Sequence, residues 1–194
     1  MIIHVPPKAR KYHSQLVTGF YAARKRIFKD RMQWDVSADN SIEMDSFDHD
    51  YAHYLVSCFN NEVIGGVRLT SSLHPNLTFE CFEKYFGKID VQRKDTLLES
   101  SRFGIENITG MQSSVLRNST LDLFCSILQM ALSYGFEEII IVVDVRMERI
   151  IGLSGWQFNR VSDVVQIGKT QTVVGVLPVG RKFIEKISSK LVKG

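Results

Sequence analysis

Charged side chains interrupt segments of this sequence that otherwise look buried. Residues 97–105 read LLESSRFGI, apolar at both ends, with Glu99 and Arg102 in the middle. Because side chains alternate between the faces of a regular strand, Glu99 should share a face with Ser101 and Phe103. Arg102 should then point to the opposite face. The two charged groups would converge only if the strand bulged between them, and bulges are common beside active sites.

Further charges sit in apolar settings. Arg24 lies four residues from both Phe20 and Phe28, so a helix would place all three on one face. A buried charge needs a partner, and an ionic network lining a polar cleft would supply one. Such a network adds little net stability, because desolvation offsets the attraction. Snorkelling of Arg24 into water, or a set of unrelated surface charges, are the simpler alternatives. The network would comprise Arg24, Arg68, Arg102, Asp45, Asp48 and Glu99.

The elements that must position these groups follow from periodicity and turn residues. The pattern predicts a helix over 14–28, a hairpin of strands 51–59 and 63–70, a short helix over 79–86, a strand at 97–105, a helix capped by Asn118 or Ser119 and ending at Gly135, a buried strand at 138–145, a short helix over 147–153, strands within 156–167 and 171–178, and a basic terminal helix. This order predicts one α/β domain over residues 1–194, a three-layer α/β/α sandwich with a mixed central sheet.

Composition narrows the class of protein. The chain has 194 residues, with 44% hydrophobic and 23% charged, which is ordinary for a globular protein. A net charge of +3 does not indicate nucleic-acid binding. No apolar run reaches the roughly 20 residues of a membrane span, and the N-terminus lacks the apolar region of a signal peptide. The 3 cysteines form no CxxC pair, so we expect a cytoplasmic protein without disulfides or a metal site.

Six short motifs stand in the order and spacing of one enzyme family. They are RKRIFKDRMQW at 24–34, EMDSFD at 43–48, GGVRLT at 65–70, Phe82, ESSRF at 99–103 and GLSGW at 152–156. In this ordered set the chain resembles the acyl-homoserine-lactone synthases, the autoinducer synthases of bacterial quorum sensing. The resemblance implies a fold similar to that of GNAT N-acyltransferases.

The resemblance also implies a reaction. An acyl chain would pass from acyl carrier protein, or from CoA in some members, to the amine of S-adenosyl-L-methionine. The acylated product would then lactonise and release 5'-methylthioadenosine. S-adenosyl-L-methionine would be a substrate, so no cofactor is expected. The partners would be acyl carrier protein and S-adenosyl-L-methionine, with neither nucleic acid nor a membrane.

Roles for single residues follow from the same resemblance. Glu99 would take, directly or through water, the proton that the amine must lose before it attacks the thioester. The alternative is that Glu99 only forms a salt bridge. Ser101 and Arg102 complete the expected catalytic set and, with nearby backbone N–H groups, would hold the substrate or the acyl carbonyl. The S-adenosyl-L-methionine side would comprise Arg24, Phe28, Trp34, Asp45, Asp48, Arg68 and Phe103.

The acyl chain requires an apolar tunnel, since each buried CH2 contributes about 0.8 kcal/mol. Its expected walls are Ile141, Val142, Val143, Met147, Ile150 and Ile151. Because residues 139–143 are wholly aliphatic, we expect an acyl chain without a 3-oxo group, which would cost about 1–3 kcal/mol to bury without a donor.

The C-terminal segment from Gly180 carries five Lys or Arg against one Glu. It is either a solvated face or a docking surface for an acidic carrier protein. The docking surface would comprise Arg146, Arg149, Arg181, Lys182, Lys186 and Lys190.

Two other functions fit parts of the pattern. A CoA-dependent GNAT-type N-acyltransferase needs a glycine-rich phosphate loop at a helix N-terminus. Residues 104–120, GIENITGMQSSVLRNST, have only two glycines, at Gly104 and Gly110, which disfavours CoA. A non-enzymatic sensor that kept the fold would have no need of the complete charged set.

Overall fold

The computed structural model describes residues 1–39, 41–87 and 89–191. One mixed sheet has the strand order β1-β2-β3-β4-β5-β8-β6, and β7 also pairs with β8. Of the paired neighbours, only β4 and β5 are parallel. The strands are β1 (Ile2–Val5), β2 (His53–Phe59), β3 (Glu62–Ser71), β4 (Leu97–Ile105), β5 (Glu138–Asp144), β6 (Asn159–Arg160), β7 (Val165–Ile167) and β8 (Thr170–Pro178).

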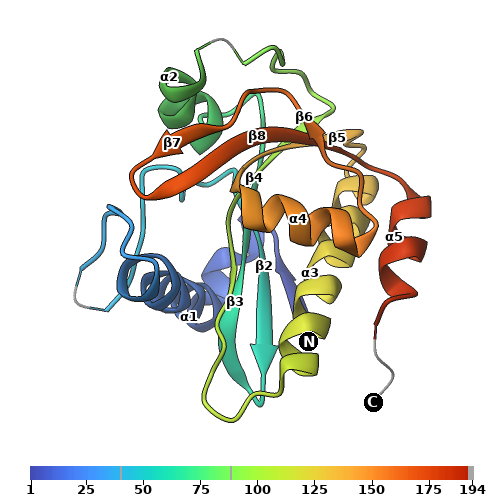
Figure 1. Cartoon of the computed structure of the whole chain (residues 1–194). Helices are drawn as coiled ribbons and strands as arrows, with labels where there is room; N and C mark the ends of the chain where they lie inside the picture. Colours follow the sequence, from blue (N-terminus) through green and yellow to red (C-terminus); the bar gives the residue numbers. More distant parts are fainter. Residues whose placement is uncertain (40, 88, 192–194) are drawn as a thin grey trace.

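Helices cover both faces of this sheet, so the three-layer sandwich is confirmed. Figure 1 shows α1 on one side of β2 and β3, and α3 on the other. The helices are the 3-10 helix η1 (Pro7–Tyr12), α1 (Ser14–Arg24), the π-helices η2 (Lys25–Arg31) and η3 (Thr78–Phe82), α2 (Glu83–Phe86), α3 (Ser113–Ser133), α4 (Val145–Ser154) and α5 (Arg181–Ser188). No helix within the described ranges is long and apolar enough to cross a membrane.

Strand β5 is buried on both faces, as its continuous apolar run predicts. Ile139 and Ile141 join the main apolar cluster, which also contains α3. Ile140 points the other way, into a smaller cluster with Phe79 of η3. The sheet is therefore anchored from both sides at the strand that lies next to β4.

The glycine pair of β3 permits close packing beside the site. A Cβ on Gly65 would lie 2.0 Å from the carbonyl oxygen of Gly104 on β4. A Cβ on Gly66 would lie 3.0 Å from the Phe20 ring of α1. Because glycine lacks that atom, α1 and β4 both approach β3 closely.

A β-bulge divides β4. Gly104 pairs with Gly66 and Ser101 pairs with Arg68, so Arg102 and Phe103 together oppose the single residue Val67. Arg102 has φ of 56°, a backbone conformation that is uncommon for a residue other than glycine. The extra residue shifts the alternation of side chains for the rest of the strand.

The bulge overturns the expected position of Phe103. In a regular strand Phe103 would share the face of Glu99 and Ser101. Instead its ring stacks on Phe124 of α3, with centroids 5.1 Å apart. Phe103 therefore packs against the main apolar cluster on the other face of the sheet, so the face expected for it was wrong. Its role beside S-adenosyl-L-methionine stays a prediction.

Some boundaries differ from the sequence prediction. Helix α3 begins at Ser113 rather than at Asn118 or Ser119. Residues 113–118 contain no glycine or proline, so nothing in the local sequence prevents the earlier start. Strand β1 was not predicted, because four residues carry little periodicity and its partner β2 lies some fifty residues away in the chain.

Candidate active site

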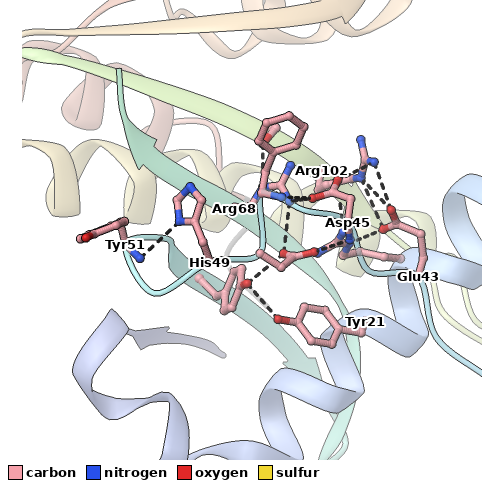
Figure 2. Close-up of polar contacts among 12 residues, drawn as sticks. Tyr21, Glu43, Asp45, His49, Tyr51, Arg68 and Arg102 are labelled. Carbon is pink, nitrogen blue, oxygen red and sulfur yellow. Dashed lines mark hydrogen bonds and ion pairs between the residues drawn. The ribbon is translucent and has the colours of Figure 1, made fainter. Parts of the chain in front are cut away.

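Three arginines and three carboxylates form a buried ionic cluster on the α1 face of the sheet (Figure 2). The arginines come from three elements: the end of α1, the middle of β3 and the bulge of β4. The carboxylates all come from the loop between η2 and β2. The cluster consists of Arg24, Arg68 and Arg102 with Glu43, Asp45 and Asp48.

Arg24 is fully buried and is held by two carboxylates. Its Nε donates to Oε2 of Glu43, and its Nη1 lies 2.7 Å from Oδ1 of Asp48. The prediction of a buried, paired Arg24 is thus confirmed, and snorkelling is excluded because its side chain is 0% exposed. The α-helix becomes a π-helix directly after this residue, and such irregularities are frequent at functional sites.

Arg68 and Arg102 complete the cluster from the sheet. Nη1 of Arg68 donates to Oδ1 of Asp45 and lies 3.2 Å from Oδ1 of Asp48. Nη2 of Arg102 lies 3.1 Å from Oε1 of Glu43 and 2.8 Å from Oδ2 of Asp45. The bulge directs Arg102 toward this loop. Of the two geometries considered for residues 97–105, a regular strand and a bulged one, the structure has the bulged one.

Glu43 replaces Glu99 as the third carboxylate of the network. The predicted network contained Glu99, and from residues 43–48 only Asp45 and Asp48, which are three residues apart. In the structure Glu43 is 0% exposed and bridges Arg24 and Arg102. Its position two residues before Asp45 could have indicated a third carboxylate of the network, because alternate residues of an extended segment share a face.

Glu99 lies beside the cluster without a direct ion pair to it. Ser101 Oγ donates to Oε2 of Glu99 at 3.0 Å, and Nε of Arg68 donates to Ser101 Oγ at 3.1 Å. Ser101 therefore links the network to a separate, 1% exposed carboxylate. A carboxylate that is not neutralised by a paired arginine is free to accept a proton.

The pKa values of Asp48 and Glu99 are shifted in opposite directions. Burial opposes ionisation of Asp48, but the charges of Arg24 and Arg68 outweigh it and hold its pKa below the usual range. At Glu99 burial dominates and raises the pKa, against the charge of Arg68 and the hydrogen bonds from Ser101 and Thr78. Pairs of titratable groups whose pKa values are pushed apart are typical of acid–base sites.

An outer ring of polar side chains supports Asp48. Tyr54 OH donates to Oδ1 of Asp48 at 2.8 Å and lies 2.9 Å from Tyr21 OH. Arg10 of η1 donates to Tyr54 OH and, at 3.2 Å, to the Asp48 carbonyl. Sequence reasoning missed these groups, because neither their spacing nor their element suggested a charged neighbour.

Phe28 and Trp34 form a stacked pair, with ring centroids 5.3 Å apart and planes at 23°. The Arg102 guanidinium carbon lies 5.8 Å from the Phe28 centroid, so the pair borders the ionic cluster. Phe28 is buried and Trp34 is half-buried. Both aromatic side chains thus lie beside the ionic cluster.

The predicted acyl-chain walls separate onto two faces. Ile141, Val143 and Ile151 belong to the main apolar cluster, and Met147 and Ile150 pack against it. Val142 packs instead against the smaller cluster on the opposite face. Val142 cannot line the same cavity as its neighbours, because side chains alternate along β5.

The predicted basic residues are all exposed and lie on two neighbouring helices and the residues that follow. Lys190 Nζ donates to the Leu153 carbonyl at the end of α4, so the segment after α5 lies against α4. Beside it, α4 and residues 155–158 line an open cavity of about 530 Å³, and Arg149 is among the lining residues. Arg181 faces a different groove, between α3 and α5.

Comparison with known proteins decides the family. The family model described as autoinducer synthase matches residues 8–187. The chain belongs to the autoinducer synthase family. It is therefore an enzyme of the acyltransferase class, as the motif order indicated.

No group of three or more His, Cys, Asp or Glu within the described residues is arranged to hold a metal ion.

Relatives of this autoinducer synthase family member span most of its length. An acyl-homoserine-lactone synthase of Rhizobium radiobacter is 28% identical over 190 residues, covering 96% of this chain and 90% of the relative. One from Pectobacterium parmentieri is 30% identical over 162 residues, covering 82% and 73%.

Solved structures agree on the fold. The CoA-dependent acyl-homoserine lactone synthase MesI superposes with a TM-score of 0.85 at 23% identity, covering 100% of this chain and 97% of that one. The synthase LasI gives a TM-score of 0.86 at 19% identity, with the same coverage. This chain thus shares its GNAT-like fold with both synthases.

Proposed function

We propose that this enzyme transfers an acyl chain from acyl carrier protein to the α-amine of S-adenosyl-L-methionine. The acylated product then lactonises and releases 5'-methylthioadenosine. The observation that carries the proposal is a buried network of three cations and three anions lying next to a separate buried carboxylate, Glu99. A substrate that carries a carboxylate, an amine and a sulfonium matches such a surface.

The substrate carboxylate would bind at Arg68. Its Nη2 is buried and has no hydrogen-bond acceptor among the described side chains and backbone. An unmet guanidinium donor is costly, so a carboxylate that accepts from it gains a charge-assisted bond. The adenosyl group would lie against the stacked Phe28 and Trp34. S-adenosyl-L-methionine thus acts as a substrate, and the reaction draws on no separate cofactor.

Glu99 would act as the general base. The α-ammonium of the substrate is mostly protonated near neutral pH and must lose a proton to become a nucleophile. Glu99 accepts that proton, directly or through a water, and the amine nitrogen forms the amide bond as the thioester C–S bond breaks. The thiol of the carrier leaves. The substrate carboxylate oxygen then attacks Cγ, and the bond from Cγ to the sulfonium sulfur breaks.

The thioester would enter where β4 and β5 part. Their parallel pairing ends at Ser100 and Ile141, although both strands continue. Backbone N–H groups of β4 beyond this point that face β5 are left to donate hydrogen bonds to the acyl carbonyl oxygen as it becomes an oxyanion. The acyl chain would continue into the main apolar cluster beside Ile141, Val143 and Ile151.

The choice of carrier protein over CoA rests on surface charge. Exposed basic side chains on and beside α4 and α5 complement an acidic carrier protein, and such rim charges act mainly on the association rate. No compact glycine-rich phosphate loop lies between β4 and α3 in the sequence.

The test is product formation with purified components. The enzyme is incubated with S-adenosyl-L-methionine and either hexanoyl carrier protein or hexanoyl-CoA, and 5'-methylthioadenosine and acyl-homoserine lactone are measured. We expect a clearly higher kcat/KM with the carrier protein. Glu99→Gln should lower turnover about 100-fold or more, as for loss of a general base, with an unchanged unfolding midpoint. Near-normal turnover of this variant would remove Glu99 as the base, and faster reaction with CoA would reassign the donor.

A further inference from the structure

Glu99 is held by a residue that no motif marks. Thr78 Oγ1 donates to Oε1 of Glu99 at 3.2 Å, while Ser101 Oγ donates to Oε2. Each carboxylate oxygen thus has its own hydroxyl donor, one from η3 and one from β4. Arg68, which bonds Ser101, is the charged group whose field reaches Glu99. No arginine or lysine pairs with Glu99 within the described part of the chain.

Thr78 is itself placed by a buried amide. It is the first residue of η3 and is 1% exposed. Just before it, the Asn76 side chain accepts from the Phe79 N–H at 3.2 Å and donates to the His74 carbonyl at 2.9 Å. Asn76 is also 1% exposed, so the loop after β3 is fixed from within. The hydroxyl of Thr78 is therefore positioned by a buried loop that the Asn76 side chain holds in place.

The Thr78 hydroxyl affects the protonation of Glu99, which a purely apolar side chain of the same size would not. A hydrogen bond donated to a carboxylate favours the ionised form, whereas burial favours the protonated form. Valine would fill nearly the same volume as threonine but would leave Oε1 of Glu99 without that donor. The Thr78 hydroxyl therefore contributes to the protonation equilibrium and the side-chain orientation of Glu99, beside the Ser101 hydroxyl and the backbone of Thr78.

We propose that Thr78 is a positioning residue for the reaction, orienting the Glu99 carboxylate and keeping it ready to accept a proton. This inference rests on the proposed function, because it takes Glu99 as the base. Thr78 itself touches no reacting atom. Its action runs through Oε1 of Glu99, as that of Ser101 runs through Oε2.

Kinetics of two variants separate positioning from packing. Thr78→Val should lower kcat/KM about tenfold and move the acid limb of its pH profile up by about one pH unit, which corresponds to a tenfold change in the protonation equilibrium. Thr78→Ser keeps the donor and should restore both. Thr120→Val is the matched control, since its hydroxyl only bonds the Leu116 carbonyl within α3, and it should leave the pH profile unchanged.

A titration without substrate keeps the test independent of turnover. With 13C-labelled glutamate and Glu99→Gln to assign the signal, Glu99 should titrate at a higher pH in Thr78→Val than in the wild type or Thr78→Ser. An unshifted titration, or equal effects of valine and serine, would make Thr78 a packing residue and overturn the proposal. If wild-type enzyme forms no acyl-homoserine lactone, the proposed function fails, while the titration still decides whether Thr78 controls Glu99.

Discussion

Arg102 binds Glu43 from a β-bulge: its Nε and Nη2 atoms each lie 3.1 Å from Oε1 of that carboxylate. The positive φ of Arg102 and the shift in register explain why this side chain reaches the same face as Ser101 and Glu99. The site is therefore assembled by an irregularity in the strand. A regular strand with the same residues would have pointed the guanidinium into the apolar layer.

Removing Arg24 should destabilise the fold strongly. Arg24→Ala leaves the fully buried Glu43 and Asp48 with fewer cations, and breaking a buried pair costs about 3–5 kcal/mol. Urea unfolding measures this loss. Lys25→Ala is the control, since its ion pair with Asp30 is more exposed and should change stability by no more than about 1 kcal/mol. Equal, small effects in both variants would mean that the cluster is solvated in solution.

Reversing charges on α5 should weaken carrier-protein binding. In Lys182→Glu with Lys186→Glu we expect a several-fold higher KM for the acyl carrier protein and a smaller dependence of KM on salt, because steering charges have been removed. The matched control is Lys84→Glu with Lys169→Glu, two exposed lysines away from α4 and α5. The same KM in both double variants would make α5 a solvated face.

Acyl-chain specificity should depend on Ser100 as well as on the aliphatic residues of β5. The Ser100 hydroxyl is buried and has no hydrogen-bond partner among the described residues, and Ser100 lies opposite Ile141. We still expect a preference for hexanoyl over 3-oxohexanoyl carrier protein. Ser100→Ala should widen this preference about tenfold by removing a hydroxyl donor beside Ile141, consistent with about 1–3 kcal/mol for an unpaired polar group. A wild-type preference for the 3-oxo donor that persists in Ser100→Ala would contradict both expectations.

Stability should fall between pH 6.5 and about 4 because of His53. Burial, and then the neighbouring His4 and Arg10, lower the pKa of His53 from 6.5 to about 4. The unfolded chain thus binds a proton that the folded chain does not, so stability is full above pH 6.5 and declines as the pH falls toward 4. Urea unfolding of His53→Asn should depend less steeply on pH across this window. His13→Asn, at an exposed histidine, should keep the wild-type slope.

The sequence identified two of the buried arginines of the cluster but not the bulge in β4. Arg24 and Arg68 stood out because a cation in an apolar run needs a buried partner, and both are buried and paired. Whether β4 bulges could not be predicted from the sequence, because the bulge depends on how β4 pairs with Gly65 and Gly66 of β3. The face expected for Phe103 was wrong for that reason.

Other parts of the site depend on contacts between distant segments. Arg10 and Tyr54 meet across 44 residues of chain, and no local pattern links them. Thr78 looked like an ordinary loop residue, because its partner Glu99 lies on another element. Strand β1 gains its structure from β2, not from its own four residues.

The bulge of β4 also constrains how this enzyme can evolve. One residue sends Arg102 toward the ionic cluster and Phe103 toward Phe124. Loss of either codon would leave one residue opposite Val67, so only one of these two directions could be kept, while Gly104 and Ile105 would retain their pairing with β3. A deletion in the bulge would therefore alter the ionic cluster and the apolar layer at the same time. Lineages that retune the acyl pocket should do so by substitution, while insertions and deletions stay outside residues 99–105.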